Sequence, residues 1–354
     1  MPLRLLAAAV LWLAAATAAF AQNAGAQDVA DFYKGRQITL IVGYGPGGGY
    51  DVYGRLVARH LGRFIPGEPV VVVQNMPGAG SLVAVNHLYN SAVKDGTVIA
   101  TFAREMPMLG ILGGNANAKF DPRRFTWLGS ASSSEEDAIL MFARKDAPVQ
   151  RIEDAVGDNA RELVLGATGQ GAAGNDWAIL LRELLGLKLR IVAGYPDSNG
   201  IFLAVERGEV QGRSLDYSAV RSSRPQWLAP DSEVRVVLQF GRPGRHKDLP
   251  AVPTARDLAR KEFARRLIDV ADLSNTLARP FAAPPGVPAE RAKAIQAAFV
   301  AATRDAHFAA EAEKMRIEIS PISGDEVLAR IERLAASPVD LLDYLRKLRI
   351  AGKG

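Results

Sequence analysis

The sequence predicts an α/β protein with two lobes, and three features of the chain carry this prediction. Runs of apolar residues alternate with segments whose apolar residues recur at helical spacing. The alternation starts again after about residue 140, and glycine-rich turns join strand to helix in both halves. Continuous apolar strands separated by helices are typical of a parallel sheet covered on both faces. With 354 residues and 48% hydrophobic composition, the chain can form two cores of ordinary size.

The first lobe is predicted to begin with a βαβαβ series. Residues 37–44 and 68–75 are continuous apolar runs that predict buried strands, and residues 97–102 predict a third strand. Helices are expected at 50–62 and 80–92, between these strands.

The second lobe repeats this order. Strands are expected at 162–168, 187–195 and 234–240 because apolar residues are continuous there. Helices are expected at 175–186 and 199–209, where the apolar residues have helical spacing.

The last hundred residues are predicted to be mainly helical. Ser323 and Glu326 have the spacing of a capping box at the start of one of these helices. We assign residues 32–140 together with 241–354 to the first lobe, and residues 141–240 to the second lobe.

Residues 1–21 have the features of a signal peptide. Arg4 precedes an apolar stretch of roughly 15 residues, and the sequence AFA at 19–21 is a small-x-small cleavage site. The alternative is a membrane anchor, but the stretch is shorter than the ~20 residues that a spanning helix needs. We therefore expect cleavage after Ala21 and export to the periplasm.

Composition excludes several kinds of chemistry. The chain has no cysteine, which excludes disulfides, thiolate nucleophiles and thiol-linked lipids. Its histidines lie far apart in the sequence without partners at metal-ligand spacing, so we expect no metal site, and nothing in the sequence calls for a cofactor. The formal charge of +5 suits an anionic ligand, and the absence of a Lys/Arg cluster argues against nucleic acid as a partner.

The strongest motif is IVGYGPGGGYD at 41–51, a glycine loop between a predicted strand and a predicted helix. Gly43, Gly45 and Gly48 match the dinucleotide-binding pattern, yet no acidic residue ends the second strand and a proline interrupts the turn. No lysine follows as in a P-loop, and the chain contains no G-x-S-x-G pentapeptide. A purely structural alternative is a tight turn in which Asp51 is the helix N-cap.

The fourth interpretation is an anion site built from backbone amides. Amides at a helix N-terminus, together with the helix macrodipole, bind carboxylates without a cationic side chain. Loops of small residues recur at 75–81, 167–175 and 194–199, so four strand-to-helix loops can face one cleft. We expect Asp51 to bond mainly to amides of its own loop and helix. Gly48→Val should block binding by filling ligand space and straining a turn with positive φ.

The predicted ligand-binding residues come from these loops and from the end of a strand in the second lobe. They are Tyr44, Gly47, Gly48, Asp51, Asn75, Pro77, Gly78, Ala79, Gly80, Thr168, Gly169, Gly171, Asn175, Tyr195, Asn199 and Asp216.

Several stretches resemble the Bug (TctC-type) extracytoplasmic solute receptors of tripartite tricarboxylate transporters. The sequence GGGYD at 47–51 is followed by NMPGAG at 75–80 and by DG at 95–96. LPAVPT at 249–254 and PPGVP at 284–288 match the family further along the chain. The matching segments span nearly the whole mature chain.

This resemblance implies an α/β protein with a type II periplasmic-binding-protein fold, in which two α/β lobes are joined by crossover strands with a ligand cleft between them. It also implies that the protein is not an enzyme. It would bind a small carboxylate as a monomer and deliver it to membrane permease subunits of a tripartite transporter. The third loop lacks the Ser and His of the family pattern, with Asn175 in their region, and the fourth keeps Tyr195 without the usual Lys. These departures leave the identity of the ligand open.

Two other functions stay open at this level. The protein could sense a ligand for a signalling partner, which the sequence does not separate from delivery to a permease. A periplasmic hydrolase or lyase is less favoured, because no paired nucleophile and base and no metal cluster is evident.

Overall fold

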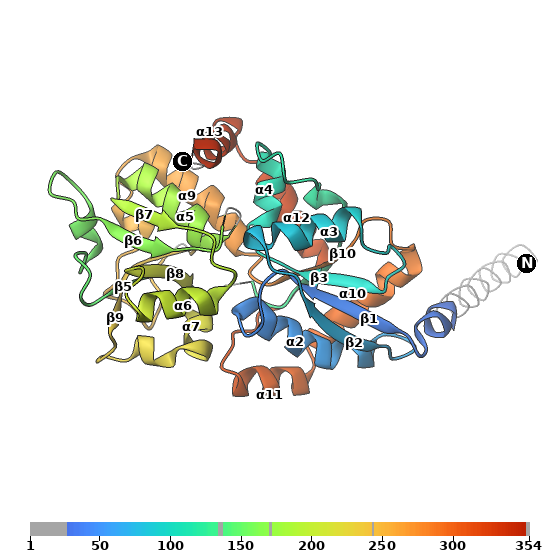
Figure 1. Ribbon diagram of the computed structural model, residues 1–354. Coiled ribbons are helices and arrows are strands. Elements are labelled where there is room, and N and C mark those ends of the chain that lie inside the picture. Colours follow the sequence, from blue (N-terminus) through green and yellow to red (C-terminus); the bar gives the residue numbers. More distant parts are fainter. Residues whose placement is uncertain (1–26, 134–136, 170–171, 243, 352–354) are drawn as a thin grey trace, which may run out of the picture.

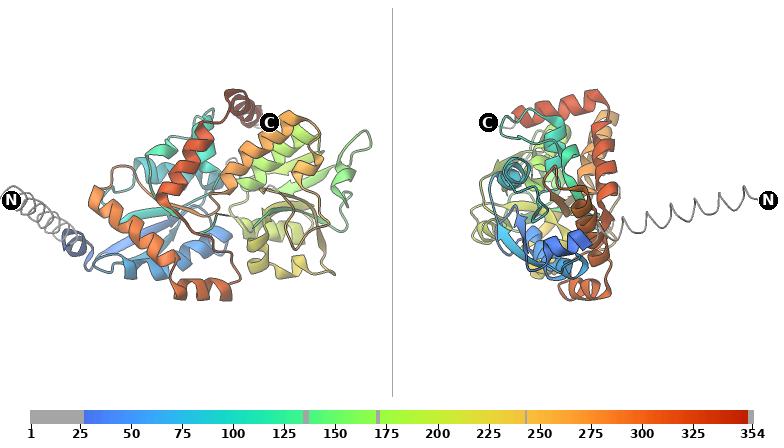
Figure 2. Two further views of the ribbon diagram at one scale, coloured as in Figure 1. Left: turned by 180° about the vertical axis from the view of Figure 1, so that it is seen from behind. Right: turned by 90° about the vertical axis from the view of Figure 1, so that its right-hand side faces the viewer.

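The structure is a computed structural model that describes residues 27–133, 137–169, 172–242 and 244–351. The signal peptide predicted at residues 1–21 lies outside the described residues. Figure 1 shows two lobes side by side, and the opposite view in Figure 2 shows the same division.

The first lobe is built on a six-stranded mixed sheet with the order β11-β4-β10-β3-β1-β2. Strands β1, β2 and β3 are parallel, whereas β10, β4 and β11 are joined to the sheet by antiparallel pairs. The strands are β1 Gln37–Val42, β2 Val70–Asn75, β3 Val98–Thr101, β4 Thr126–Ser130, β10 Pro280–Ala283 and β11 Ile322–Ser323.

The second lobe contains a five-stranded mixed sheet with the order β7-β6-β8-β5-β9. Strands β7, β6 and β8 are parallel to one another, and β5 is antiparallel to both β8 and β9. The strands are β5 Ile139–Arg144, β6 Leu163–Gly166, β7 Leu189–Val192, β8 Gly212–Asp216 and β9 Val234–Phe240.

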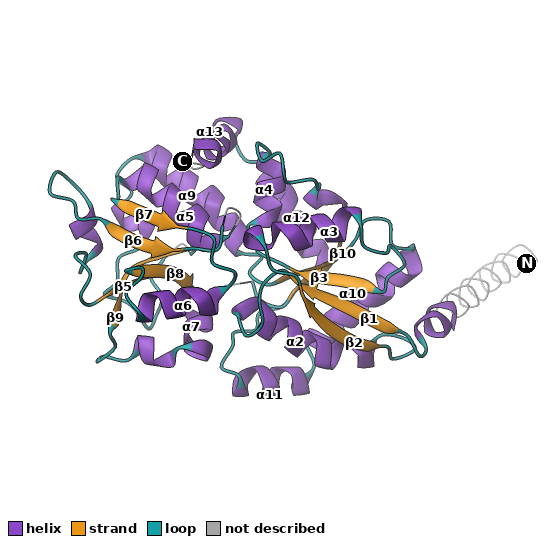
Figure 3. Ribbon diagram, in the orientation of Figure 1, coloured by secondary structure: helices purple, strands orange, loops and turns teal. Residues whose placement is uncertain are grey.

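Helices cover both faces of each sheet (Figure 3). In the first lobe, α2 Gly49–Leu61, α10 Ala289–Thr303 and α11 Ala306–Lys314 pack on one face. The helices on its other face are α3 Leu82–Asn90, α4 Met106–Leu112 and α12 Gly324–Ala335. In the second lobe, α6 Ser198–Glu206 and α7 Tyr217–Ser223 cover one face, and α5 Ala173–Leu185 the other. The predicted α/β fold with two lobes is therefore confirmed, and the capping box of Ser323 and Glu326 is present at the start of α12.

One predicted strand has a different environment from the one expected. The continuous valines of residues 70–73 predicted a buried strand, but β2 lies at the edge of the first sheet. Val70 and Val72 are exposed, so this strand is covered on one face only. An apolar run alone does not distinguish an edge strand from a central one, because periodicity reports nothing about the neighbouring strands.

Two helices of the C-terminal segment pack against the core of the second lobe. Helix α9 Glu262–Asn275 packs through Leu267 and Ile268 into the core beneath the second sheet. Helix α13 Val339–Ala351 joins the same core through Leu341 and Leu345. We propose that the lobe boundary follows the sheets and places these two helices and the short α8 Ala255–Leu258 with the second lobe, although residues 241–354 were assigned to the first.

No helix in the described part of the chain is long and apolar enough to cross a membrane.

Candidate functional site

A cavity of about 70 Å³ lies between the lobes. The first lobe lines it with the glycine loop after β1, the turn after β3 and the residue before β10. The second lobe contributes the ends of β6 and β8 and the first turns of α5 and α6. Residues of both lobes therefore enclose the same space.

The position of the cavity follows from the topology of the second sheet. Gly166 at the end of β6 pairs with Arg213 of β8, and from there the chain leads into α5. Because β7 lies on one side of β6 and β8 on the other, α5 and α6 cover opposite faces of the sheet. A crevice outside the carboxyl ends of the strands at such a switch point is the usual ligand site of an open α/β sheet.

Four of the predicted ligand-binding residues line this cavity: Tyr44, Gly48, Thr168 and Asp216. Gly171 lies outside the described residues. The others are not among its lining residues, namely Gly47, Asp51, Asn75, Pro77, Gly78, Ala79, Gly80, Gly169, Asn175, Tyr195 and Asn199.

Asp51 and Asn75 do not line the cavity but hold the glycine loop in place through hydrogen bonds. The Asp51 carboxylate accepts hydrogen bonds from Gly47 N, Arg55 Nε and Asn75 Nδ2, each at 2.8 Å. Asn75 Nδ2 also donates to the Tyr44 carbonyl at 2.8 Å. Burial opposes ionisation of Asp51, but these three donors hold the pKa of its carboxyl below the ordinary value. The expectation that Asp51 is the N-cap is wrong, because Gly48 precedes the helix and Asp51 lies within its first turn.

The structural role of glycine in this loop differs from one position to the next. A Cβ on Gly43 would lie 2.7 Å from Ser81 Cβ, so this glycine permits the close approach of the second loop. Gly47 has φ of +79°, which favours glycine. Gly48 has φ of −78°, and its Cβ would meet only the Gly45 carbonyl at 3.7 Å. The predicted backbone strain of Gly48→Val is therefore wrong, although Gly48 does line the cavity.

Other predicted residues lie where the lobes contact each other. Asn199 Nδ2 donates to the Pro46 carbonyl at 3.2 Å. Gly169 lies beside the second loop, and a Cβ on it would be in ordinary van der Waals contact with Gly80 N at 3.5 Å. Tyr44 of the first lobe and Thr168 of the second line the same cavity. These contacts indicate a closed arrangement in which loops of the two lobes touch.

Gly45→Ala is expected to weaken ligand binding by obstructing this contact. A Cβ on Gly45 would overlap the Asp197 carboxylate and lie 3.2 Å from Asp197 Cβ. Asp197 is the N-cap of α6 and accepts from Gly200 N at 3.0 Å, so moving it aside would cost the cap. We expect about a tenfold loss of affinity, or ~1.4 kcal/mol, in calorimetric titration.

The matched control is Gly244→Ala, because the Cβ of that residue would meet no atom within 4 Å. Gly244→Ala should melt at the temperature of the parent protein, whereas Gly45→Ala should melt slightly lower because the cap of α6 is lost. Equal affinities for Gly45→Ala and Gly244→Ala would show that the bound state does not use this contact.

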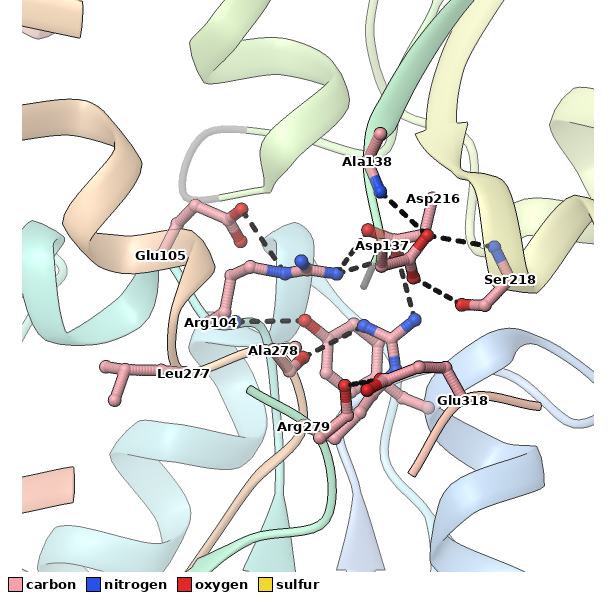
Figure 4. Close-up of polar contacts among 12 residues, drawn as sticks. Arg104, Glu105, Asp137, Ala138, Asp216, Ser218, Leu277, Ala278, Arg279 and Glu318 are labelled. Atoms are coloured by element: carbon pink, nitrogen blue, oxygen red, sulfur yellow. Dashed lines mark hydrogen bonds and ion pairs between the residues drawn. The ribbon is translucent and has the colours of Figure 1, made fainter. Parts of the chain in front are cut away.

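Two buried arginines of the first lobe bind the carboxylate of Asp216 in the second (Figure 4). Arg104 Nη2 lies 2.6 Å from both carboxylate oxygens, and Arg279 Nη2 lies 2.8 Å from Oδ2. Burial opposes ionisation of Asp216, but the two guanidinium groups hold the pKa of its carboxyl at about 2. Asp216 is therefore satisfied within the protein and bridges the two lobes.

A third buried arginine, Arg213, also lines the cavity. Its Nη1 donates to the Ser198 carbonyl at 2.7 Å and its Nη2 to Ser198 Oγ at 3.2 Å. The guanidinium lies 4.4 Å from the centre of the Phe202 ring. Within the described residues no carboxylate forms an ion pair with it, and Nε has no hydrogen-bond partner. Burial lowers the pKa of Arg213 to about 9.

The sequence prediction missed these three arginines because it looked for loops of small residues. A signal was present at Arg213, since GRSLD places a charged residue inside a strand of small and apolar residues. Lys and Arg are rarely fully buried unless they are paired, so an arginine at such a position points to a function. Arg104, Arg213 and Arg279 therefore line the cavity in addition to the loops of small residues.

The sequence of the chain is similar to that of known proteins over part of its length. No family model matches the chain. A UPF0065 protein of Bordetella pertussis (strain Tohama I) is 26% identical over 223 residues, which cover 60% of this chain and 64% of that protein. The chain thus matches less than two thirds of the length of this curated relative.

Two solved structures have the same fold over most of the chain. The periplasmic binding protein BugD superposes with a TM-score of 0.69 and 19% identity, covering 90% of this chain and 99% of BugD. Rpa4515 of R. palustris, solved with adipate, gives a TM-score of 0.67 and 18% identity, covering 89% of this chain and 97% of that one.

The chain therefore has the fold of the periplasmic binding proteins, with a cavity between its two lobes. In sequence the chain is similar to a UPF0065 protein and to BugT, which confirms the resemblance to the Bug (TctC-type) family.

Proposed function

We propose that the protein is a periplasmic solute-binding receptor that captures a small carboxylate between its lobes and delivers it to a tripartite tricarboxylate-type transporter. The observation that carries this proposal is Arg213, a buried guanidinium that lines the cavity without a carboxylate partner among the described residues. A buried charge is costly unless it is paired. A ligand carboxylate would supply the missing partner.

The surroundings of Arg213 support a small ligand held from both lobes. Gly48 and Tyr44 of the first lobe face the cavity opposite the first turns of α5 and α6. The helix N-termini add amides and the positive end of the macrodipole, which favour an anion. Gly48, Thr168 and Asp216 thus stay in the proposed site, whereas Asp51 and Asn75 are proposed to position the glycine loop.

We further propose that the protein acts as a monomer and without chemical transformation of its ligand. The solved structures support a binding role, since BugD is described as a periplasmic binding protein and Rpa4515 was solved with adipate. Export with cleavage after Ala21 and delivery to permease subunits complete the proposal.

The test is a ligand screen on the purified protein. Native mass spectrometry would first detect any small molecule that co-purifies. Thermal shifts would then compare carboxylates with nucleotides and neutral sugars. A carboxylate at 100 times its dissociation constant should add about 2.7 kcal/mol to the free energy of unfolding. A panel in which carboxylates have no effect, while nucleotides or sugars raise the melting temperature, would refute the proposal.

A further inference from the structure

We infer that the ligand is a small zwitterion, a carboxylate that also carries an ammonium group, held between Arg213 and Glu105. This inference rests on the proposed receptor function and names the chemistry of its ligand. The two side chains have opposite charge, both are buried and both line the same cavity.

Glu105 follows β3 in the first lobe and directly precedes α4. Its side chain is only 3% exposed, and its Oε1 has no hydrogen-bond partner within the described part of the chain. The closest cation is Arg104, whose Nε lies 3.9 Å from Oε1. Arg104 is already bound to Asp216 at 2.6 Å, so it compensates Glu105 only partly.

The two groups approach the cavity from different sides. Arg213 contacts Ser198 and Phe202 of α6. Glu105 also lines a small apolar pocket beside Trp177 and Leu180 of α5. Since α5 and α6 cover opposite faces of the second sheet, the cation and the carboxyl group flank the cavity. Among the residues that the structure describes, no ion pair joins these two groups.

Arg213 and Glu105 each lack a full partner of opposite charge, which a zwitterion would provide. Burial lowers the pKa of Arg213 to about 9 and raises the pKa of Glu105 to about 7, so both charged forms are disfavoured in the free protein. A ligand carboxylate beside Arg213 and a ligand ammonium beside Glu105 would stabilise both charges. A second carboxylate at Glu105 would instead meet a group of its own sign.

The size of the cavity favours a small ligand. Its volume of about 70 Å³ is well below the roughly 300–1,000 Å³ of pockets that bind drug-sized ligands. Small amino acids have this size, and the hydroxyl of Ser214, which lines the cavity without a partner among the described residues, can serve as a further polar contact.

The test measures affinities for matched ligand pairs that differ only in the ammonium group. Glycine with acetate, alanine with propionate, and aspartate with succinate are titrated calorimetrically into the parent protein. We expect at least one amino acid to bind at least tenfold more tightly than its partner. This ratio requires no variant and therefore does not depend on whether a variant folds.

Glu105→Gln then assigns the preference to this carboxyl group. The change keeps the shape and removes the charge, so it should weaken binding of the amino acid at least tenfold and leave the plain carboxylate within about threefold. The control is Glu313→Gln at an exposed position of α11, which should change neither affinity.

The outcomes separate the two proposals. If acetate, propionate or succinate binds as tightly as its amino acid partner, the zwitterion is refuted and the carboxylate receptor stands. The zwitterion is also refuted if Glu105→Gln leaves the preference unchanged. If no compound of the panel binds, while a nucleotide or sugar does, both proposals fail.

Discussion

Arg213→Met is expected to abolish tight binding of the carboxylate while the protein stays folded. The substitution keeps a long side chain next to Phe202 and removes the guanidinium that faces the cavity. Removing one partner of a buried, hydrogen-bonded charge pair costs about 2–5 kcal/mol of binding free energy. This corresponds to a loss of affinity between roughly 30-fold and several thousandfold, measured by calorimetric titration.

The same variant should be at least as stable as the parent protein without ligand. Burial lowers the pKa of Arg213 to about 9, which means that folding works against its charge at neutral pH. Removing that charge offsets the loss of two hydrogen bonds to Ser198. Urea unfolding measures this, and Arg190→Met, at an exposed position paired with Glu162, provides the control. Unchanged affinity in Arg213→Met would exclude Arg213 from the binding site.

Asp216→Asn is expected to have the largest effect on stability. It leaves Arg104 and Arg279 buried without the carboxylate that both of them contact. Breaking a buried ion pair from one side costs about 3–5 kcal/mol, because the remaining charge is uncompensated. Urea unfolding of the parent and the variant at neutral pH would measure this loss.

The pH dependence provides a second measurement of the same bridge. The pKa of Asp216 is lowered from 3.8 to about 2 in the folded protein. The contribution of the Asp216 carboxylate to the free energy of unfolding is therefore present in full above pH 3.8. It is lost as the pH falls towards 2. The difference in stability between the parent and Asp216→Asn should shrink over this interval.

Asp146→Asn is the matched control, since Asp146 pairs with Arg144 at an exposed position of the same lobe. Exposed ion pairs contribute only about 0–1 kcal/mol. Should Asp216→Asn lose no more stability than this control, the bridge would not stabilise the fold. Small-angle scattering would then show whether the lobes open and hydrate the two arginines.

The elements of the fold could be predicted because their signals are local. Residues 38 and 40–42 are apolar and lie in β1, and the apolar positions of residues 49–61 have the spacing of a helix buried on one face. Ser323 and Glu326 form their capping box within a single turn of chain. The loops at strand ends reach a common cleft because parallel strands end at the same edge of a sheet.

The partners of the site residues could not be predicted in this way. Asp51 has the residue type and approximate place of an N-cap, yet it binds Arg55 and Asn75 and supports the loop from behind. Val70 has the sequence environment of a buried strand, but its strand has no neighbour on one side. Each outcome depends on elements that are distant in the sequence.

The sequence by itself determined the two α/β lobes, the βαβαβ order of residues 37–102 and the placement of glycine loops at the strand ends, because these follow from local periodicity and turn chemistry. The strands β4, β5, β10 and β11 were not predicted. Only the tertiary structure decided which charges meet in the cavity. Arg104 and Asp216 are 112 residues apart and Arg279 follows Asp216 by 63. Whether such a charge is compensated, like Asp216, or left for a ligand, like Arg213, depends on how the lobes pack and on the water they exclude, and neither is encoded in any short stretch of chain.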